Sequence, residues 1–251
     1  MITIRQLGCR LDGRVILHDV NLHIRRGDTV SVMGVSGSGK TTLLKILAGL
    51  IRPTSGQVFI DGTDITELSE EDLNRIRHRV GVVFQYGALF DSLTVYENVA
   101  FALSRHTRLS SKEIDDIVEE KLALVGLAGT PNLMPSQLSG GMQKRVSLAR
   151  AIAMNPEVLF YDEPTSGLDP VMTTVIDDLI TEMRDKLSVT SVVASHDIRS
   201  IFRISDRIAM LHGGAIVSYG TPEEIQESSD ERVRQFVRGL AEGPIRPGVH
   251  S

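Results

Sequence analysis

Short β-rich runs and glycine-containing turns alternate over the first part of the chain. Helical spacing interrupts them over Lys40–Leu50, where Leu43, Leu44, Leu47 and Leu50 share one face. The other apolar runs have the lengths of strands and are separated by turn signals such as Asp12-Gly13 and Asp61-Gly62. The pattern predicts strands over Ile2–Leu7, Val20–Ile24, Thr29–Met33 and Gly56–Ile60.

The middle of the chain changes to helical periodicity. After a strand-like run at Val80–Phe84, the spacing is helical from Thr94 to Val125, with Ser110 or Ser111 as an N-cap. A further helical pattern starts after Ser139-Gly140-Gly141. We therefore predict a helical lobe over residues 91–156, inserted between residues 1–90 and 157–225 of an α/β lobe.

The third block returns to alternating strands and helices and ends in an apolar helical stripe. The stripe is Val233, Phe236, Val237 and Leu240, within a C-terminal helix and tail predicted over residues 226–251. It either packs on its own domain or docks on a second subunit. Irregular chain is expected over 243–248. The predicted strands are Val158–Tyr161, Thr190–Ala194, Arg207–Leu211 and Ile216–Ser218, and the predicted helices are Val171–Leu187 and Ile198–Ile204.

Composition narrows the class of protein. The 251 residues carry 27 basic and 32 acidic side chains, a net charge of −5, which disfavours a nucleic-acid partner. The one cysteine, Cys9, excludes an internal disulfide and indicates a reducing compartment. No apolar run approaches the length of a membrane span, and Met1–Gln6 lacks a signal-peptide pattern, so we expect a cytoplasmic protein.

A glycine-rich loop after the Thr29–Met33 strand carries the first candidate chemistry. The loop fits G-x-x-x-x-G-K-[ST] at every position, between an apolar strand and an amphipathic helix. Such a loop turns backbone N–H groups toward a nucleotide phosphate. A merely flexible glycine loop would not require Lys-Thr at the helix start. The candidate nucleotide-binding residues are Gly34, Ser36, Gly37, Ser38, Gly39, Lys40, Thr41 and Thr42.

Two carboxylates follow the buried run Val158–Tyr161. Asp162 and Glu163 would therefore lie at the carboxyl end of a strand, which faces the ligand crevice in open α/β sheets. Asp162 is suited to Mg²⁺ together with Thr41. Glu163 is placed to act as general base on a water. Solvated acids in an ordinary turn are the alternative.

Ser139-Gly140-Gly141 opens a helix and could form a second anion-binding helix terminus. We expect it to face a nucleotide across a dimer interface; a capped helix with a glycine hinge is the alternative. Lys144 and Arg145 are read either as phosphate contacts or as solvent-facing residues. The basic run 75–79 is read as a solvated helix end.

Motifs in this order resemble the nucleotide-binding subunit of ABC transporters. They are LSGGMQKR followed by LARA, and then FYDEPTSGLDP. The resemblance implies a P-loop NTPase of ABC type over residues 1–240, with a mixed central sheet, an antiparallel β subdomain and an inserted helical subdomain. It also implies ATP hydrolysis with Mg²⁺, a head-to-tail homodimer and integral membrane permease partners.

The resemblance also assigns roles to single residues. It implies that Gln85 contacts Mg²⁺ and the permease interface, that Asp169 belongs to a loop crossing the dimer, and that His196 contacts the γ-phosphate. Ser139-Gly140-Gly141 would bind the ATP held by the opposite subunit. Leu11 stands where the family usually has an aromatic residue on adenine, so GTP use stays open. The implied catalytic set is Lys40, Gln85, Glu163 and His196, and the implied metal set is Thr41, Gln85 and Asp162.

The finer resemblance is to ATPases of the MCE-associated (Mla-type) phospholipid-trafficking systems of bacteria. It is carried by residues 84–90, by residues 133–142 and by the tail Arg232–Phe236 with Gly243-Pro244. It implies phospholipid cargo, an MCE-domain partner, and a location on the inner face of the cell membrane through the permease. Residues 87–93 would form part of the permease groove, with Leu89 or Phe90 packing in the core. An importer for a small polar solute, such as an amino acid or a metal chelate, is the alternative.

Overall fold

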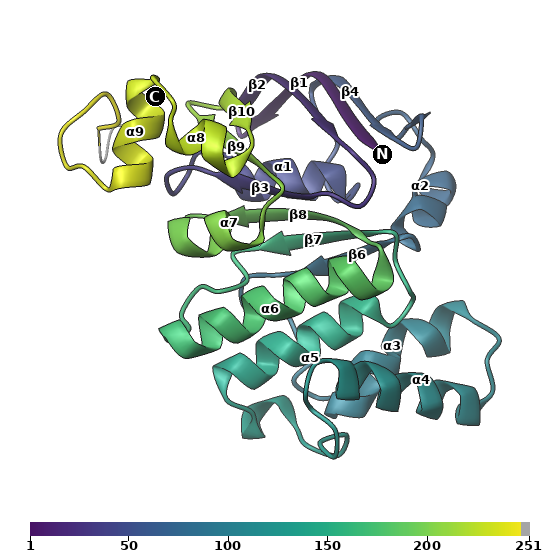
Figure 1. Ribbon diagram of the computed structural model, residues 1–251. Coiled ribbons are helices and arrows are strands. Elements are labelled where there is room, and N and C mark those ends of the chain that lie inside the picture. The colour runs from purple at the N-terminus through teal and green to yellow at the C-terminus, as the bar shows by residue number, and fades with distance from the viewer. Residues whose placement is uncertain (247–251) are drawn as a thin grey trace.

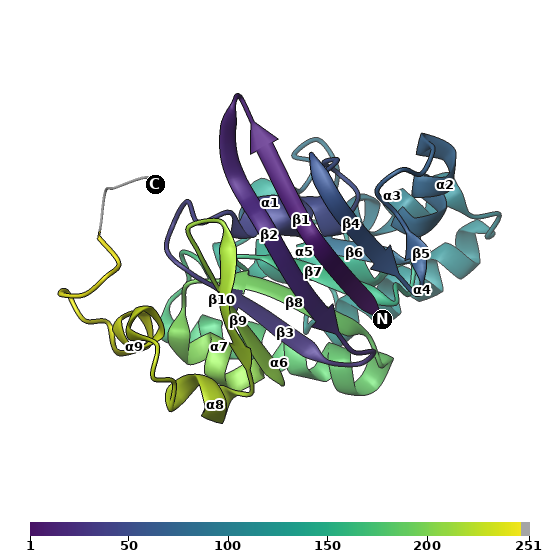
Figure 2. The same ribbon diagram turned by 90° about the horizontal axis from the view of Figure 1, so that it is seen from above.

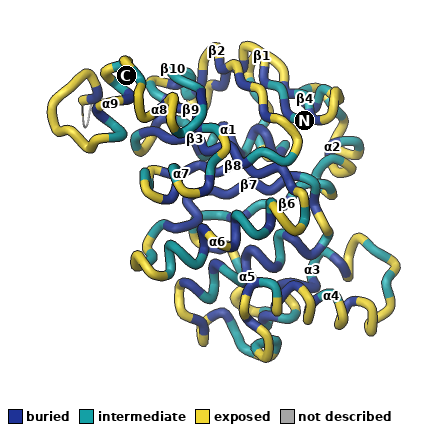
Figure 3. The backbone as a smooth tube through the Cα atoms, viewed as in Figure 1, coloured by how far each residue is buried: buried dark blue, intermediate teal, exposed yellow. Residues whose placement is uncertain are grey.

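The computed structural model describes residues 1–246 and contains two β-sheets (Figure 1). The larger sheet has the order β10-β9-β3-β8-β7-β6, in which only β10 runs antiparallel to its neighbour. Figure 3 shows its central strands buried between layers. The strands are β3 (Thr29–Met33), β6 (Val80–Val83), β7 (Val158–Asp162), β8 (Thr190–Ser195), β9 (Arg207–His212) and β10 (Ala215–Gly220).

The smaller sheet is antiparallel, in the order β2-β1-β4-β5, and lies above the larger one (Figure 2). Its first two strands are longer than predicted, because Gln6 and Asp19 adopt positive φ and register shifts interrupt the alternation of apolar residues. The pairing resumes beyond these irregularities to the hairpin tip. The strands are β1 (Ile2–Leu11), β2 (Arg14–Ile24), β4 (Ser55–Ile60) and β5 (Thr63–Asp64).

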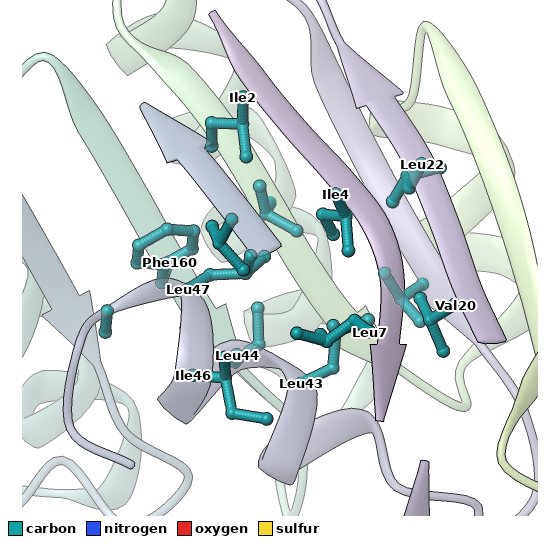
Figure 4. Packing of buried hydrophobic residues seen from close by; sticks show 14 of the residues in the cluster. Ile2, Ile4, Leu7, Val20, Leu22, Leu43, Leu44, Ile46, Leu47 and Phe160 are labelled. Carbon is teal, nitrogen blue, oxygen red and sulfur yellow. The ribbon is translucent and has the colours of Figure 1, made fainter. Parts of the chain in front are cut away.

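Helix α1 (Lys40–Leu47) fills the space between the two sheets. Its Leu43 and Leu47 are fully buried and pack with Ile2 and Leu7 of β1 (Figure 4). The helix was expected to continue to Leu50, but it ends at Leu47, two residues before Gly49, whose φ of +67° favours glycine. Leu50 therefore leaves the apolar face and is 48% exposed.

Helices cover the opposite face of the larger sheet (Figure 1). The helical pattern from Thr94 to Val125 is two helices, each with a capping box, at Thr94 and at Ser110. None of the helices within residues 1–246 is long and apolar enough to cross a membrane. The helices on this face are α3 (Val95–His106), α4 (Ser111–Leu124), the 3₁₀ turn η1 (Pro135–Gln137), α5 (Gly140–Ile152) and α6 (Pro170–Leu187). Helix α2 (Glu70–Arg77) lies instead on the side of the smaller sheet, where Leu73 joins its core.

The C-terminal helices α7 (Ile198–Ile204), α8 (Pro222–Gln226) and α9 (Glu231–Arg238) pack against one end of the larger sheet. Val233 of α9 is fully buried in a cluster with Met33 and Met210, so the stripe packs on its own domain. Leu240 lies beyond the helix and is 52% exposed. Residues 247–251 of the predicted tail, with the end of the irregular segment 243–248, lie outside the described residues.

Candidate nucleotide-binding site

The loop between β3 and α1 is held so closely by its neighbours that two positions require glycine. A Cβ on Gly34 would lie 2.3 Å from the carbonyl oxygen of Leu211. Gly39 has φ +104°, and a Cβ there would lie 2.8 Å from Leu17 Cδ2. The loop is therefore pinned between β9 and β2, in the strand–loop–helix context that the sequence predicted.

Lys40 points into this loop. Its side chain is 7% exposed, and Nζ donates to the carbonyl oxygens of Gly34 at 2.8 Å and Val35 at 3.2 Å. Burial lowers the pKa of Lys40, while the nearby Glu163 opposes that shift. The buried Ser38 Oγ has no hydrogen-bond partner within residues 1–246. A concave loop with a buried ammonium and an unpaired hydroxyl fits a phosphate group.

Thr41 and Asp162 meet where α1 begins and β7 ends. Thr41 Oγ1 donates to Asp162 Oδ1 at 2.9 Å, which joins two of the three predicted metal residues. Burial raises the pKa of Asp162, and the hydrogen bond from Thr41 opposes that shift. A hydroxyl and a carboxylate are the hard oxygen donors that Mg²⁺ takes alongside phosphates and water. The donor set therefore fits a magnesium ion.

Glu163 connects the phosphate loop to His196. Its carboxylate lies 3.6 Å from Lys40 Nζ through Oε1 and 2.8 Å from His196 Nδ1 through Oε2. Because β7 and β8 are parallel neighbours, the residues that follow them emerge side by side (Figure 1). Glu163 itself has φ +48°, a strained conformation fixed by the bond from its N–H to Ala194 O at 2.8 Å. In this backbone conformation, the mostly buried carboxylate of Glu163 points toward Lys40 in the phosphate loop.

Gln85 and Asp169 lie at the edges of this cluster. Gln85 follows β6, and its Nε2 donates to Ser166 Oγ at 3.4 Å. Asp169 is the N-cap of α6, where one carboxylate oxygen accepts from the backbone N–H groups of Val171 and Met172. Within this chain the Asp169 side chain is therefore engaged in capping, and its nucleotide contact stays a prediction.

Ser139 and Gly140 are exposed at the start of α5. Ser139 is the N-cap, as the alternative interpretation held, and its Oγ accepts from Met142 N at 3.3 Å. Among the described residues, no hydrogen bond joins Ser139, Gly140 or Gly141 to the phosphate loop. The helix start is thus presented to the surface rather than to the nucleotide loop of its own chain, and its anion-binding role stays a prediction.

The hairpin between β1 and β2 covers the phosphate loop. Ile16 and Leu17 of β2 lie directly against Gly39, at the end of the phosphate loop. The tip of the hairpin, where Leu11 pairs with Arg14, follows directly on from this contact. Leu11 and Val15 near that tip are 36% and 44% exposed. An apolar surface of this kind can contact a purine base without aromatic stacking.

Lys144 does not face solvent, contrary to one of its two interpretations. It is 7% exposed, and Nζ donates to the carbonyl oxygens of Gln85 and, at 3.2 Å, of Glu163, a role that the sequence did not indicate. Arg145 donates to the carbonyls of Val125 and Gly126 after α4. The long side chain of a lysine in a helix can reach a buried carbonyl oxygen. The acceptors of Lys144 belong to Gln85 and Glu163, which are far from it in sequence, so the local pattern does not predict this contact.

The basic run 75–79 is only partly a solvated helix end. Arg79 lies beyond α2 and forms ion pairs with Glu157 at 2.7 Å and Asp61 at 2.6 Å. Arg77 donates to the carbonyl oxygen of Gly49 at 2.6 Å. The run therefore ties α2 and β6 to their neighbours.

The geometry can be compared with known proteins. Residues 17–166 match the family described as ABC transporter. The chain belongs to the ABC transporter family. The predicted ABC-type fold and ATP-hydrolysing activity are thereby confirmed.

Similar proteins cover nearly the whole chain. The intermembrane phospholipid transport system ATP-binding protein MlaF of Haemophilus influenzae is 42% identical over 98% of this chain and 93% of its own. MlaF of Escherichia coli K12 is 41% identical over 98% and 91%. A solved dimer of the ATP-binding cassette MJ0796 in a post-hydrolysis state with ADP and Pi has a TM-score of 0.82 and 35% identity, covering 88% of this ABC ATPase and 99% of that cassette.

Proposed function

We propose that this ABC ATPase powers a membrane transporter that moves phospholipid. The observation that carries the proposal is the near full-length similarity to two MlaF proteins named for phospholipid transport. A third relative, the probable ribonucleotide transport ATP-binding protein mkl of Mycobacterium tuberculosis, is 44% identical over 92% of this chain but only 64% of its own. Phospholipid is favoured because the MlaF relatives match in length as well as in sequence.

The working unit we propose is a head-to-tail homodimer. The solved cassette related to this chain is a dimer, and here Ser139 and Gly140 are exposed away from their own phosphate loop. The helical segment 91–156 would act as one lobe and the remainder as the other. Leu240 is a candidate contact with the second subunit; since it is exposed, Leu240→Asp tests this without disturbing the buried Val233. Unchanged dimerisation of that variant would remove the tail from the interface.

In the proposed reaction, ATP and water give ADP and phosphate. Lys40 and the phosphate-loop N–H groups bind the phosphates and stabilise the charge on the γ-phosphoryl group. Glu163 accepts a proton from the attacking water, and His196, hydrogen-bonded to Glu163, holds the γ-phosphate. Thr41 and Asp162, with Gln85 near them, would hold Mg²⁺, which supplies charge neutralisation on the phosphates.

The permease is proposed to dock beside Gln85. Tyr86 and Phe90 follow Gln85 on the surface, 85% and 43% exposed, while Leu89 packs against the core. Exposed aromatic residues are typical of a protein interface. The small hollow lined by Phe84 also includes Thr41 and Asp162, so the proposed docking surface adjoins the proposed metal site. This arrangement would place the ATPase on the inner face of the membrane, bound through its partner.

The test is purification from native membranes with mass spectrometry of the bound proteins. We expect integral permease subunits together with an MCE-domain protein, and phospholipid in the extract. A periplasmic solute-binding protein for an amino acid or metal chelate would overturn the cargo. The variant Tyr86→Ser should lose the permease and keep ATP binding, whereas Glu119→Gln on the exposed face of α4 should keep both.

A further inference from the structure

One face of α5 binds the backbone of the segment that follows β6. Three side chains spaced three residues apart on this helix donate to three of the four carbonyl groups of residues 85–88, here named the Gln85 segment. Lys144 bonds Gln85 O, and Ser147 Oγ bonds Gly87 O at 2.9 Å. Arg150 bonds Gly87 O at 2.8 Å and Ala88 O at 2.7 Å.

The bonds made by Ser147 and Lys144 are shielded from water, since Ser147 is fully buried and Lys144 is 7% exposed. A buried donor that loses its acceptor is left with an unsatisfied polar group, so these contacts break only at a free-energy cost. The Gln85 segment is therefore held against α5.

Lys144 makes an additional contact that its two helix neighbours do not make. Its Nζ also donates to Glu163 O at 3.2 Å, and this bond involves the backbone rather than the carboxylate. Burial lowers the pKa of Lys144, whereas the charges of Glu163 and Asp162 oppose that shift. One ammonium group thus joins α5, the Gln85 segment and the end of β7.

We infer that Lys144 is a positioning residue for ATP hydrolysis, holding the start of α5 and the backbone of Glu163 in register with the Gln85 segment. The inference rests on the proposed function, in which Ser139 at the start of the same helix completes the site of the opposite subunit. Because Ser139 and Lys144 share α5, a displacement of the Gln85 segment is transmitted directly to Ser139. The ammonium donates to two backbone carbonyl oxygens, so we expect its effect to be on geometry rather than on binding.

The experiment compares Lys144→Met with wild type and with Lys112→Met, an exposed lysine on α4. Steady-state ATP hydrolysis, equilibrium ATP binding and thermal unfolding are measured on the full chain. We expect Lys144→Met to lower kcat by about tenfold or more while KM stays within about threefold, because the loss falls on the closed geometry. Lys144→Arg should restore at least about a third of kcat, since it keeps the charge and the donors.

ATP-driven dimerisation supplies a readout that general destabilisation would not move. It is measured by size-exclusion chromatography in a Glu163→Gln background, where the carbonyl bonded by Lys144 is unchanged. We expect Lys144→Met to weaken that dimerisation by about tenfold while ATP binding to the monomer is preserved. Wild-type kcat and dimerisation in Lys144→Met would overturn the inference, as would a loss of ATP binding by a folded Lys144→Met monomer.

Two further measurements separate the possible failures. If Lys144→Met does not fold, Ser147→Ala decides, with an expected loss of about threefold in kcat and none in ATP affinity. A Ser147→Ala enzyme with wild-type kcat would then refute the role of the contact. If wild type itself does not hydrolyse ATP, or Glu163→Gln turns over like wild type, the proposed function fails instead.

Discussion

Glu163→Gln separates the proton-accepting role of Glu163 from its structural contacts. The amide has the shape of the carboxylate and keeps an oxygen that can accept from His196, so folding should be preserved. It cannot take a proton from water. A positioned general base contributes about 10²–10⁴-fold, so we expect kcat to fall about 10³-fold, or about 4 kcal/mol.

The same variant should bind ATP more tightly. Lys40 Nζ lies 3.6 Å from the Glu163 carboxylate, and such charges attract by about 5 kcal/mol at an effective dielectric constant of about 20. This attraction competes with phosphate for the ammonium group. If desolvation offsets about two thirds of it, the remaining ~1.4 kcal/mol corresponds to about tenfold in affinity.

Turnover at saturating MgATP and equilibrium binding of ATP check both values. ATP should also drive a stable dimer of Glu163→Gln, visible by light scattering. The matched control Glu119→Gln makes the same chemical change on the exposed face of α4 and should behave like wild type. A kcat within about tenfold of wild type would refute Glu163 as the base.

Three other variants probe the surrounding structure. The guanidinium of Arg79 lowers the pKa of Glu157 to about 2. The ionised Glu157 therefore stabilises the folded state at pH values above the ordinary carboxyl pKa, and this stabilisation is lost as the pH falls toward 2. Because Glu157 is 39% exposed, Glu157→Gln should lower the free energy of unfolding by only about 1 kcal/mol at pH 7. The same variant should weaken the dependence of that free energy on pH between about pH 4.5 and 2. An unchanged dependence on pH would contradict the role of the Arg79–Glu157 pair. Leu11→Tyr should tighten ATP binding by about 0.5–1.5 kcal/mol through stacking, measured by calorimetry, and no gain would place the base elsewhere. Val233→Ala should lower the unfolding free energy by about 1–3 kcal/mol in denaturant titrations while ATP binding persists, and a neutral result would contradict its burial.

Local sequence predicted the elements whose periodicity is unbroken. Strand β7 and helix α6 lie within one residue of their predicted bounds, because their patterns run directly into caps or turns. Strands β1 and β2 were predicted too short, since Gln6 and Asp19 break the alternation by bulging rather than by ending the strand. Pairing with the other strand continues the sheet beyond each bulge, and the local sequence pattern of one strand contains no information about its partner.

The candidate site divides in the same way. Lys40 and Thr41 were found because their spacing is fixed by one loop. That Glu163 contacts both Lys40 and His196 follows from strand order, which brings together segments more than thirty residues apart. The burial of Lys144 could not be predicted, because a lysine in a helix usually faces water. Its acceptors, Gln85 O and Glu163 O, are backbone atoms that any residue would supply.

The chain from residue 84 to residue 157 leaves the larger sheet from the end of β6 and returns at the start of β7. These strands are parallel neighbours, so the departure and the return lie at opposite ends of one strand pair. At the return, the carbonyl oxygen of Arg79 accepts hydrogen bonds from the N–H groups of Glu157 and Val158. At the departure, Lys144 joins the carbonyl oxygens of Gln85 and Glu163. Between these two points, Val146 and Leu148 of the insertion are buried in one cluster with Leu159 and Tyr161 of β7, so any displacement of the inserted helices must also disturb the packing of the strand that carries Asp162.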